Sequence, residues 1–312
     1  MTATRRFLLI LVGVGMACSS DAPSGTAARL QWEHELTADM PTSIDGTTDM
    51  VLVAASELWA RSGGSWAALP VEGGAWHSVR MGKDGTAWVT SRTSAVARFD
   101  GRRWTTTRRT DRGMGVDVAQ LGDEVWVTGT HDEIHRWTGK AGWQEWNPPE
   151  LSRHHTGVLW GASLQDVWLA VQPRETGRAP ELAHWDGVGW TIEPLQSKGY
   201  ITSMDGSASD DVWAVGYTGK MIGKGPLVAH WDGKRWSELE VPSGSRLADV
   251  DVDAHGVVWI AGHDGVLLRG DERGFSRVAA PPGDLHGVVA LPGGELWVLV
   301  DGDQVHHAVW TP

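Results

Sequence analysis

The chain has 312 residues, and it is rich in Trp (20) and Gly (40) while holding only 2 Tyr and 3 Phe. Hydrophobic residues make up 41% and charged residues 21%, which supplies a sizeable core and excludes a wholly disordered chain. The formal net charge of −12 argues against nucleic acid, and against electrostatic docking on anionic lipid. An excess of both Trp and Gly is typical of one short unit repeated along the chain.

The first 17 residues predict a secretory signal peptide. Arg5 and Arg6 precede an apolar run over residues 7–17, which is too short to span a bilayer and ends at small residues. The single cysteine of the chain, Cys18, follows directly. This arrangement resembles the lipobox of bacterial lipoproteins, although Gly15 stands where that family prefers Leu. The resemblance implies acylation of Cys18; the alternative is a plain signal peptide cleaved nearby.

Residues 18–28 predict a lipid-anchored flexible tether, because they consist mainly of Ser, Ala, Pro, Gly, Thr and Asp. Ser19 follows the cysteine, and the sorting rule known for Gram-negative lipoproteins then implies the outer membrane, on its periplasmic or its surface side. Removal of the signal leaves 25 basic and 39 acidic residues, a formal charge of −14. No cysteine would remain in the folded part, which excludes thiol catalysis and disulfides there.

One unit recurs seven times over residues 29–312. Its first signature is a strand-like apolar segment around a central Trp, or Leu52 in the earliest copy, and successive copies lie 36 to 46 residues apart. The Trp residues of this signature are Trp88, Trp126, Trp168, Trp213, Trp259 and Trp297. Its second signature is an Asp-Gly pair between two apolar runs, as at Asp100, Asp186 and Asp232. Such a pair predicts a hairpin in which both turn residues take positive φ.

Each unit therefore predicts four strands, named a to d, with negligible helix. In the sixth unit they cover residues 247–252, 257–261, 265–268 and 275–278. The last unit ends at Trp310 before its strand d, and residues 30–36 resemble the strand d of other units. We expect an all-β, seven-bladed β-propeller with four antiparallel strands per blade, in which an N-terminal strand closes the last blade. The Trp residues should pack within and between blades.

The repeats resemble those of bacterial β-propeller proteins with the pattern D-x-V-W-A-V-G followed by H-W-D-G-x-x-W. The segments that carry the resemblance begin at Asp210 and His230, and it extends over the whole mature chain. The resemblance implies the fold and no particular activity, since propellers host many unrelated functions.

Most variation in loop length between copies falls on the d–a and b–c loops, which emerge on one face of a propeller. Insertions on one face of a repeat array are typical of a binding face. Basic residues outnumber acidic ones there, which favours an anionic polysaccharide or an acidic protein surface; ordinary solvated charge is the alternative. The loop candidates for ligand binding are Arg109, Arg112, Arg153, Arg174, Arg178, Tyr217 and Lys220.

A second set of candidates lies near the start of strand a, where side chains should ring the mouth of the central channel. These residues are His77, Asp117, Thr156, Tyr200 and His286, and they form a pocket or simply bind channel water.

Other polar residues predict structure rather than chemistry. His184 and His230 occupy one repeat column, and the neighbours His154 and His155 should point to opposite faces of a strand. The alternating residues Asp249, Asp251 and Asp253 share one face but are too far apart to converge on calcium, and Asp253 fits a turn. We expect no metal and no cofactor.

Two functions remain open. The first is a non-enzymatic, lipid-anchored cell-envelope propeller that binds a protein or polysaccharide through its loop-rich face and meets the membrane only through its lipid. The second is a channel-mouth enzyme similar to streptogramin B lyases, whose D-G-x-x-W-F motifs resemble the segment from Asp84 to Trp88, although Val89 follows here. That resemblance implies His77 or His286 as the base. No catalytic residue is assigned in the first case.

Overall fold

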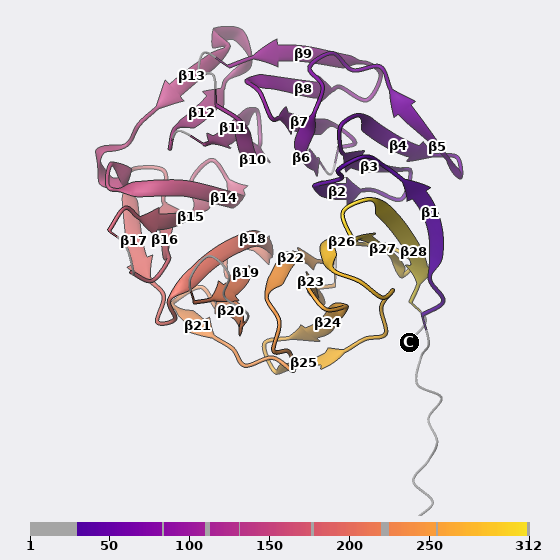
Figure 1. Ribbon diagram of the computed structural model, residues 1–312. Coiled ribbons are helices and arrows are strands. Elements are labelled where there is room, and N and C mark those ends of the chain that lie inside the picture. The colour runs from indigo at the N-terminus through magenta and orange to yellow at the C-terminus, as the bar shows by residue number, and fades with distance from the viewer. Residues whose placement is uncertain are drawn as a thin grey trace, which may run out of the picture.

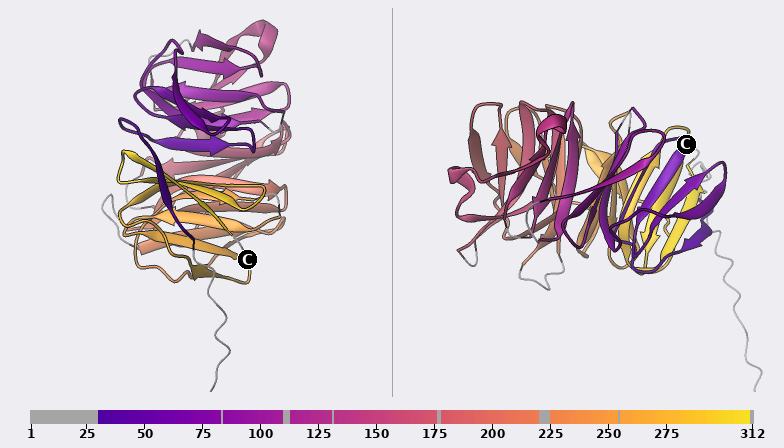
Figure 2. Two further views of the ribbon diagram at one scale, coloured as in Figure 1. Left: turned by 90° about the vertical axis from the view of Figure 1, so that its right-hand side faces the viewer. Right: turned by 90° about the horizontal axis from the view of Figure 1, so that it is seen from above.

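The computed structural model describes residues 30–82, 84–109, 113–130, 132–175, 178–219, 225–253 and 255–310. Seven four-stranded antiparallel sheets stand around a central axis as the blades of a β-propeller (Figure 1). Figure 2 shows the same ring from two sides, with the sheets upright around that axis. The fold predicted from the repeats is confirmed.

The first four blades follow one another along the chain, each with its first strand nearest the axis. Blade 1 comprises β2 (Ser43–Gly46), β3 (Met50–Ala54), β4 (Leu58–Ser62) and β5 (Ser65–Leu69). Blade 2 comprises β6 (Trp76–Met81), β7 (Ala87–Ser91), β8 (Ala95–Phe99) and β9 (Trp104–Arg108). Blade 3 comprises β10 (Gly115–Leu121), β11 (Glu124–Gly129), β12 (Ile134–Trp137) and β13 (Trp143–Trp146). Blade 4 comprises β14 (His154–Ser163), β15 (Asp166–Pro173), β16 (Glu181–Trp185) and β17 (Trp190–Pro194).

The remaining three blades complete the ring. Blade 5 comprises β18 (Gly199–Ala208), β19 (Asp211–Thr218), β20 (Gly225–Trp231) and β21 (Trp236–Glu238). Blade 6 comprises β22 (Leu247–Val252), β23 (Val258–Gly262), β24 (Val266–Asp271) and β25 (Gly274–Arg277). Blade 7 comprises β26 (Leu285–Leu291), β27 (Glu295–Val300), β28 (Gln304–Val309) and β1 (Glu33–Thr37). Two short 3-10 helices, η1 (Gly139–Ala141) and η2 (Pro149–Leu151), are the only helices in these described ranges.

The N-terminal strand closes the last blade, as the sequence predicts. β1 pairs antiparallel with β28, so that Glu33 lies opposite His307 and Thr37 opposite Gln304 (Figure 1). The strand starts three residues later than the predicted segment and ends one residue beyond it. Predicted strand bounds in blade 6 are also close to those observed, and residues 247–252 coincide with β22.

The turns between strands c and d differ from the prediction in their backbone. The glycines Gly101, Gly187 and Gly233 have φ of 86°, 91° and 83°, but the aspartates that precede them do not lie at positive φ. Instead, each aspartate accepts hydrogen bonds from the backbone N–H groups two and three residues further on. Expecting positive φ at both residues was therefore wrong, because the carboxylate itself organises the turn. These donors lower the pKa of all three carboxyl groups.

Aromatic pairs join consecutive blades at the same height around the ring. The indole at the start of strand d packs edge-on against the strand-b indole of the preceding blade. Trp66 meets Trp297 with ring centroids 5.8 Å apart, and Trp236 meets Trp168 at 5.0 Å. Further joints of this kind are Trp143 on Trp88, Trp190 on Trp126 and Phe275 on Trp213. The Trp columns thus pack between blades, as predicted.

The opposite side of each strand-b indole is covered from within its own blade. His184 stacks on Trp168 with centroids 4.2 Å apart, and its Nε2 is hydrogen-bonded to Asp166 Oδ1 at 2.7 Å. His230 lies in the same way on Trp213. In blades 2, 3 and 6 an arginine takes this place over the strand-b indole, and in blade 7 His307 stacks on Trp297. The structural role predicted for the two histidines is confirmed.

Aspartates of the innermost strands bind the backbone of the next blade. Asp249 Oδ2 accepts from the N–H of Val288 at 2.9 Å, and Asp251 Oδ2 accepts from that of Ala290 at 2.9 Å. Equivalent bonds run from Asp45 to Met81, from Asp117 to Leu159 and from Asp205 to Val252. Asp253 instead organises the a–b turn through the N–H groups of His255 and Val257, as predicted. The alternating aspartates therefore join blades.

The predicted signal peptide, Cys18 and the tether lie outside the described residues, as do Arg112 and Lys220.

Candidate binding site on the loop-rich face

The d–a and b–c loops emerge together on one side of the ring, named here the loop-rich face. Three hollows open among these loops in blades 3 to 5. Hollow 1, of about 260 Å³, is lined by Asp132, Glu133, Ile134, Glu145, Asn147, Pro148, Leu151, Ser152, His154, Thr156 and Arg174. Hollow 2, of about 330 Å³, is lined by His155, Thr156, Gly157, Ala170, Val171, Gln172, Pro180, Tyr200 and Ile201. Hollow 3, of about 440 Å³, lies further out, at β20 and the end of β21.

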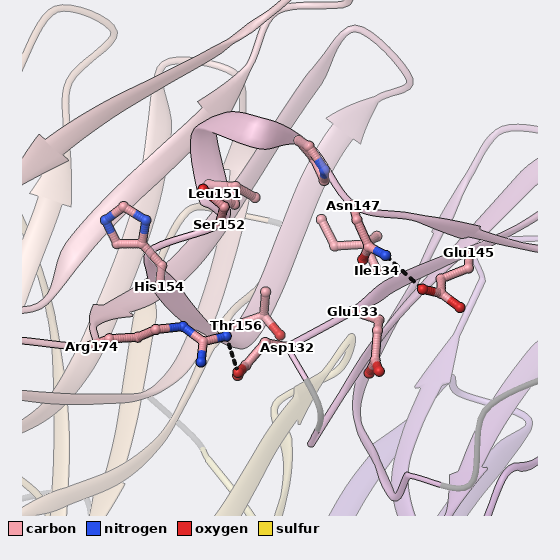
Figure 3. A pocket seen from close by; sticks show the side chains of 11 residues that line it. Asp132, Glu133, Ile134, Glu145, Asn147, Leu151, Ser152, His154, Thr156 and Arg174 are labelled. Carbon is pink, nitrogen blue, oxygen red and sulfur yellow. Dashed lines mark hydrogen bonds and ion pairs between the residues drawn. The ribbon is translucent and has the colours of Figure 1, made fainter.

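The wall of hollow 1 is built by the d–a loop of blade 3. Prolines at positions 148 and 149 start the short helix η2, where their fixed φ suits the first turn. Leu151 at its end is buried in the core shared with blade 4 and anchors the loop. The Ser152 hydroxyl closes the turn by donating to the carbonyl oxygen of Pro149 at 2.7 Å. Ile134 adds a second buried side chain beneath the hollow (Figure 3).

An ion-pair node holds two loops together beside this wall. Asp132 Oδ2 accepts a hydrogen bond from Arg174 Nη2 at 2.7 Å (Figure 3). Its Oδ1 lies 2.9 Å from His155 Nδ1. Asp132 has φ of 68°, which is uncommon for a residue with a side chain and persists only where its surroundings hold it. The node joins the b–c loops of blades 3 and 4, and so fixes one edge of the hollow.

The adjacent histidines separate in the way that a strand requires. His154 Nε2 is hydrogen-bonded to Glu181 Oε2 at 2.8 Å, and this pair is largely buried. His155 points to Asp132 and keeps about half of its side chain exposed. The predicted opposite orientation of the two rings is confirmed, and each imidazole serves a different carboxylate.

Hollow 2 is mainly apolar and adjoins the channel mouth. The small residues Gly157 and Ala170 face each other there, and a Cβ on Gly157 would lie 3.0 Å from the carbonyl oxygen of Ala170. Tyr200 forms another wall, with its ring 5.4 Å from that of Tyr217. Burial and the neighbouring Tyr200 raise the pKa of Tyr217, which keeps the Tyr217 hydroxyl uncharged at neutral pH.

The surroundings of the channel-mouth histidines His77 and His286 favour the uncharged imidazole. Burial and the positive charge of Arg92 lower the pKa of His77, whose Nδ1 is buried without a hydrogen-bond partner. Burial and His263 lower the pKa of His286, and these two rings meet edge-on at 5.2 Å. The carboxylate of Asp284 lies 2.7 Å from Nδ1 of His263. Among His77, His263 and His286, the imidazole that is hydrogen-bonded to a carboxylate is therefore His263. The lyase resemblance instead implies His77 or His286 as the base.

Deeper in the channel, one arginine meets a group of carboxylates. Burial works against the charged guanidinium of Arg80, but the negative charges of Asp117, Asp45, Asp249 and Asp205 outweigh it and raise its pKa. Burial raises the pKa of Asp45 and Asp249, and that of Asp205 to about 7. Burial and the charge of Asp205 raise the pKa of Asp251 well above its usual range.

The sequence-predicted candidates end in different places. Thr156 and Arg174 line hollow 1, and Tyr200 lines hollow 2 with Tyr217 behind it. Arg153 and Arg178 are exposed on nearby loops. Two others are buried: Arg109 donates to the Gly113 carbonyl oxygen, and Asp117 accepts from Ser78 and from the Leu159 N–H.

Several residues of hollow 1 were not among the predicted candidates. Asp132 and Glu133 belong to the acidic loop residues that the basic ones outnumber, and Ile134, Glu145 and Leu151 belong to no predicted site. Neither repeat signature contains these positions, because the loops in which they lie differ between blades. The one available signal is the Asn-Pro-Pro run at residues 147–149, which predicts an ordered turn.

Within the described ranges, no group of three or more His, Cys, Asp or Glu side chains is arranged to hold a metal ion. No helix in those ranges is long and apolar enough to cross a membrane.

Comparison with known proteins identifies the architecture. No protein-family model and no curated protein matches the chain. The match with a streptogramin B lyase structure covers 90% of this chain and 98% of the lyase chain, with a TM-score of 0.74 and 11% identity. The match with a chain of the mitotic checkpoint complex covers 98% of this chain and 99% of that one, with a TM-score of 0.69 and 13% identity. The match with YCF48 bound to a D1 peptide covers 90% of this chain and 95% of the YCF48 chain, with a TM-score of 0.64 and 15% identity. At these identities, what the chain shares with them is the β-propeller fold.

Proposed function

We propose that this chain is a non-enzymatic β-propeller that binds a protein partner through hollows 1 and 2 of its loop-rich face. The observation that carries the proposal is the adjoining position of the two hollows, which share Thr156 and are framed by the Asp132 node. A polar hollow beside an apolar one is the usual composition of a recognition site.

The compared structures support a protein as the partner. One propeller of the same architecture occurs in a checkpoint complex, and another is bound to a peptide. The apolar lining of hollow 2 also favours a polypeptide side chain over a polysaccharide, because sugars present hydroxyl groups that need hydrogen-bond partners.

Site-specific photo-crosslinking in cells tests this function. A photoreactive phenylalanine analogue replaces Gln172 at hollow 2 in the full chain, and a control chain carries it at Val188, which is 89% exposed on the c–d turn face. We expect a discrete protein adduct from position 172 that is absent from position 188. Adducts at both positions, or at neither, contradict the proposal.

We also propose that the chain is a lipoprotein of the cell envelope at the outer membrane, anchored through Cys18. The sequence of residues 1–28 supports this. Cys18→Ala should release the protein from the membrane fraction, and retention of the variant in that fraction would refute the anchor.

The absence of catalysis is tested directly. The purified mature domain should leave a streptogramin B lactone ring intact, as followed by mass spectrometry. Ring opening that is lost in His286→Ala or His77→Ala would favour the enzyme instead.

A further inference from the structure

The ridge between hollows 1 and 2 is the first part of strand β14. His154 and Thr156 line hollow 1, while His155, Thr156 and Gly157 line hollow 2. Because Thr156 lines both hollows, the two adjoin along this strand. A single extended segment that crosses β14 therefore reaches both.

Of the carboxylates that line hollow 1, Glu145 is the exposed one. Asp132 is already occupied by Arg174 and His155. Glu145 lies on the other side of the hollow, is exposed, and accepts a hydrogen bond from the side chain of its neighbour Asn147 at 2.6 Å (Figure 3). A carboxylate has about four lone-pair directions in all, so about three remain for a charged donor beside the Asn147 bond.

The floor between these groups is apolar. Ile134 and Leu151 are buried beneath the hollow, and Pro148 adds a further apolar surface. Lysine and arginine combine an aliphatic stem with a charged head, so they match an apolar floor that ends at a carboxylate. The formal charge of −12 on the whole chain attracts a basic segment as well.

The lining of hollow 2 suits a different kind of side chain from that of hollow 1. Its walls are Ala170, Val171, Ile201 and the ring of Tyr200, with Gln172 at the polar edge. An aromatic or branched aliphatic side chain fills such a space and meets the tyrosine ring.

We propose that the two hollows form one groove for an extended polypeptide segment, with a lysine or arginine in hollow 1 and an aromatic or aliphatic side chain in hollow 2. This inference rests on the proposed function, and it names the chemistry of the partner. It replaces the anionic ligand that the loop charges favoured with a basic one.

Fluorescence polarisation with synthetic peptides tests the inference on the mature domain. The probes are Gly-Ser nonapeptides that carry one Lys and one Phe at spacings of two to five residues, with matched peptides in which Lys becomes Glu or Phe becomes Ser. We expect binding at one narrow range of spacing, and at least a tenfold loss for either matched peptide.

Variants of the chain assign each side chain to its hollow. Glu145→Gln should weaken the Lys-Phe peptide about tenfold, whereas Glu193→Gln, which removes an exposed carboxylate from the outer strand β17, should not. Tyr200→Ala should weaken it similarly, and Tyr200→Phe should keep binding because the ring is retained.

Two outcomes overturn the inference: equal binding of the Lys and Glu peptides, or equal effects of Glu145→Gln and Glu193→Gln. If either occurs while photo-crosslinking at position 172 still gives its adduct, the partner-binding function stands and only the assigned chemistry fails. If the crosslink is also absent, the proposed function fails with it.

Discussion

A few side chains of each repeat unit perform the same physical task in blade after blade. The strand-b indole is covered on one side by a His or Arg of its own blade and on the other by an aromatic ring of the next. In blades 3, 4 and 5 the acidic residue two positions before the indole binds that Arg or His, as Asp166 binds His184. This interlocking explains why 20 Trp are concentrated in one chain.

Replacing one such indole by alanine measures how much its packing between two blades contributes to the free energy of unfolding. Trp213 is 1% exposed and lies between His230 and Phe275. Trp213→Ala should lower the free energy of unfolding by about 3–5 kcal/mol, because it removes a buried ring and leaves a cavity. Urea denaturation measures this change. The control is Val188→Ala at an 89% exposed site, which should change the free energy of unfolding by no more than about 0.5 kcal/mol. Equal effects of the two variants would contradict the role of the joint.

The channel carboxylates predict a pH dependence. Burial raises the pKa of Asp205 to about 7, near Asp45, Asp251 and Arg80. Between pH 4 and 7 the folded state then holds a proton that the unfolded state has lost. Its contribution to stability is complete below about pH 4 and is lost as the pH rises through 7.

Asp205→Asn should therefore flatten the fall in melting temperature between pH 5 and 8 and should raise it above pH 7. The amide oxygen can still accept from the Val252 N–H. Asp232→Asn is the control, because the lowered pKa of Asp232 keeps it ionised in both states over this range. An unchanged slope in Asp205→Asn would contradict the account.

At the scale of elements, closure of the ring depends on a strand from the opposite end of the chain. β1 completes blade 7, and Trp32 just before it donates its indole N–H to the Ala279 carbonyl oxygen of the preceding blade. The aspartates of the innermost strands add bonds between neighbouring blades on the axis side. Strand pairing and inter-blade bonds therefore act together at the seam.

Deletion of residues 30–37 tests the seam. Without β1, the strand β28 loses its partner and the Leu36 side chain no longer fills the core between blades 7 and 1. We expect the melting temperature to fall by more than 10 °C, or folding to fail, by circular dichroism. Glu33→Ala, at an exposed position of the same strand, should change it by less than 2 °C. A deletion variant with the same melting temperature as the full chain would refute the role of β1 in closing the ring.

The elements also show what a sequence can and cannot predict. Strand pairs and blade number follow from positions such as Trp168 and Asp186, because the same physical requirement recurs seven times and each copy supports the others. Hollow 1 depends on Asp132, Glu145 and Leu151, which occur once each in loops of different length. Their approach to one another is set by the packing of blades 3 and 4, which no local pattern contains.

For the molecule as a whole, the channel is an electrostatic unit that links distant blades. Arg80 of blade 2 faces carboxylates of blades 1, 3, 5 and 6, and their negative charge raises its pKa. A cation shared in this way balances like charges that would otherwise repel across the axis.

Arg80→Met should therefore destabilise the ring by about 1–3 kcal/mol at pH 8, since it leaves the partly buried channel carboxylates without that charge. The loss should shrink towards pH 5, where carboxyl groups with raised pKa are protonated. Chemical denaturation at both pH values measures this. A loss that is the same at pH 5 and pH 8 would show that the guanidinium acts only by filling space.

We propose that the loop-rich face of blades 3 to 5 binds the partner. Hydrogen–deuterium exchange of the mature domain, with and without the Lys-Phe peptide that binds most tightly, tests it most directly. We predict slower exchange in residues 143–157, 170–175 and 199–202, with no change in the c–d turns around Asp100, Asp186 and Asp232. Protection of those turns, or uniform exchange over the whole ring, would contradict the account.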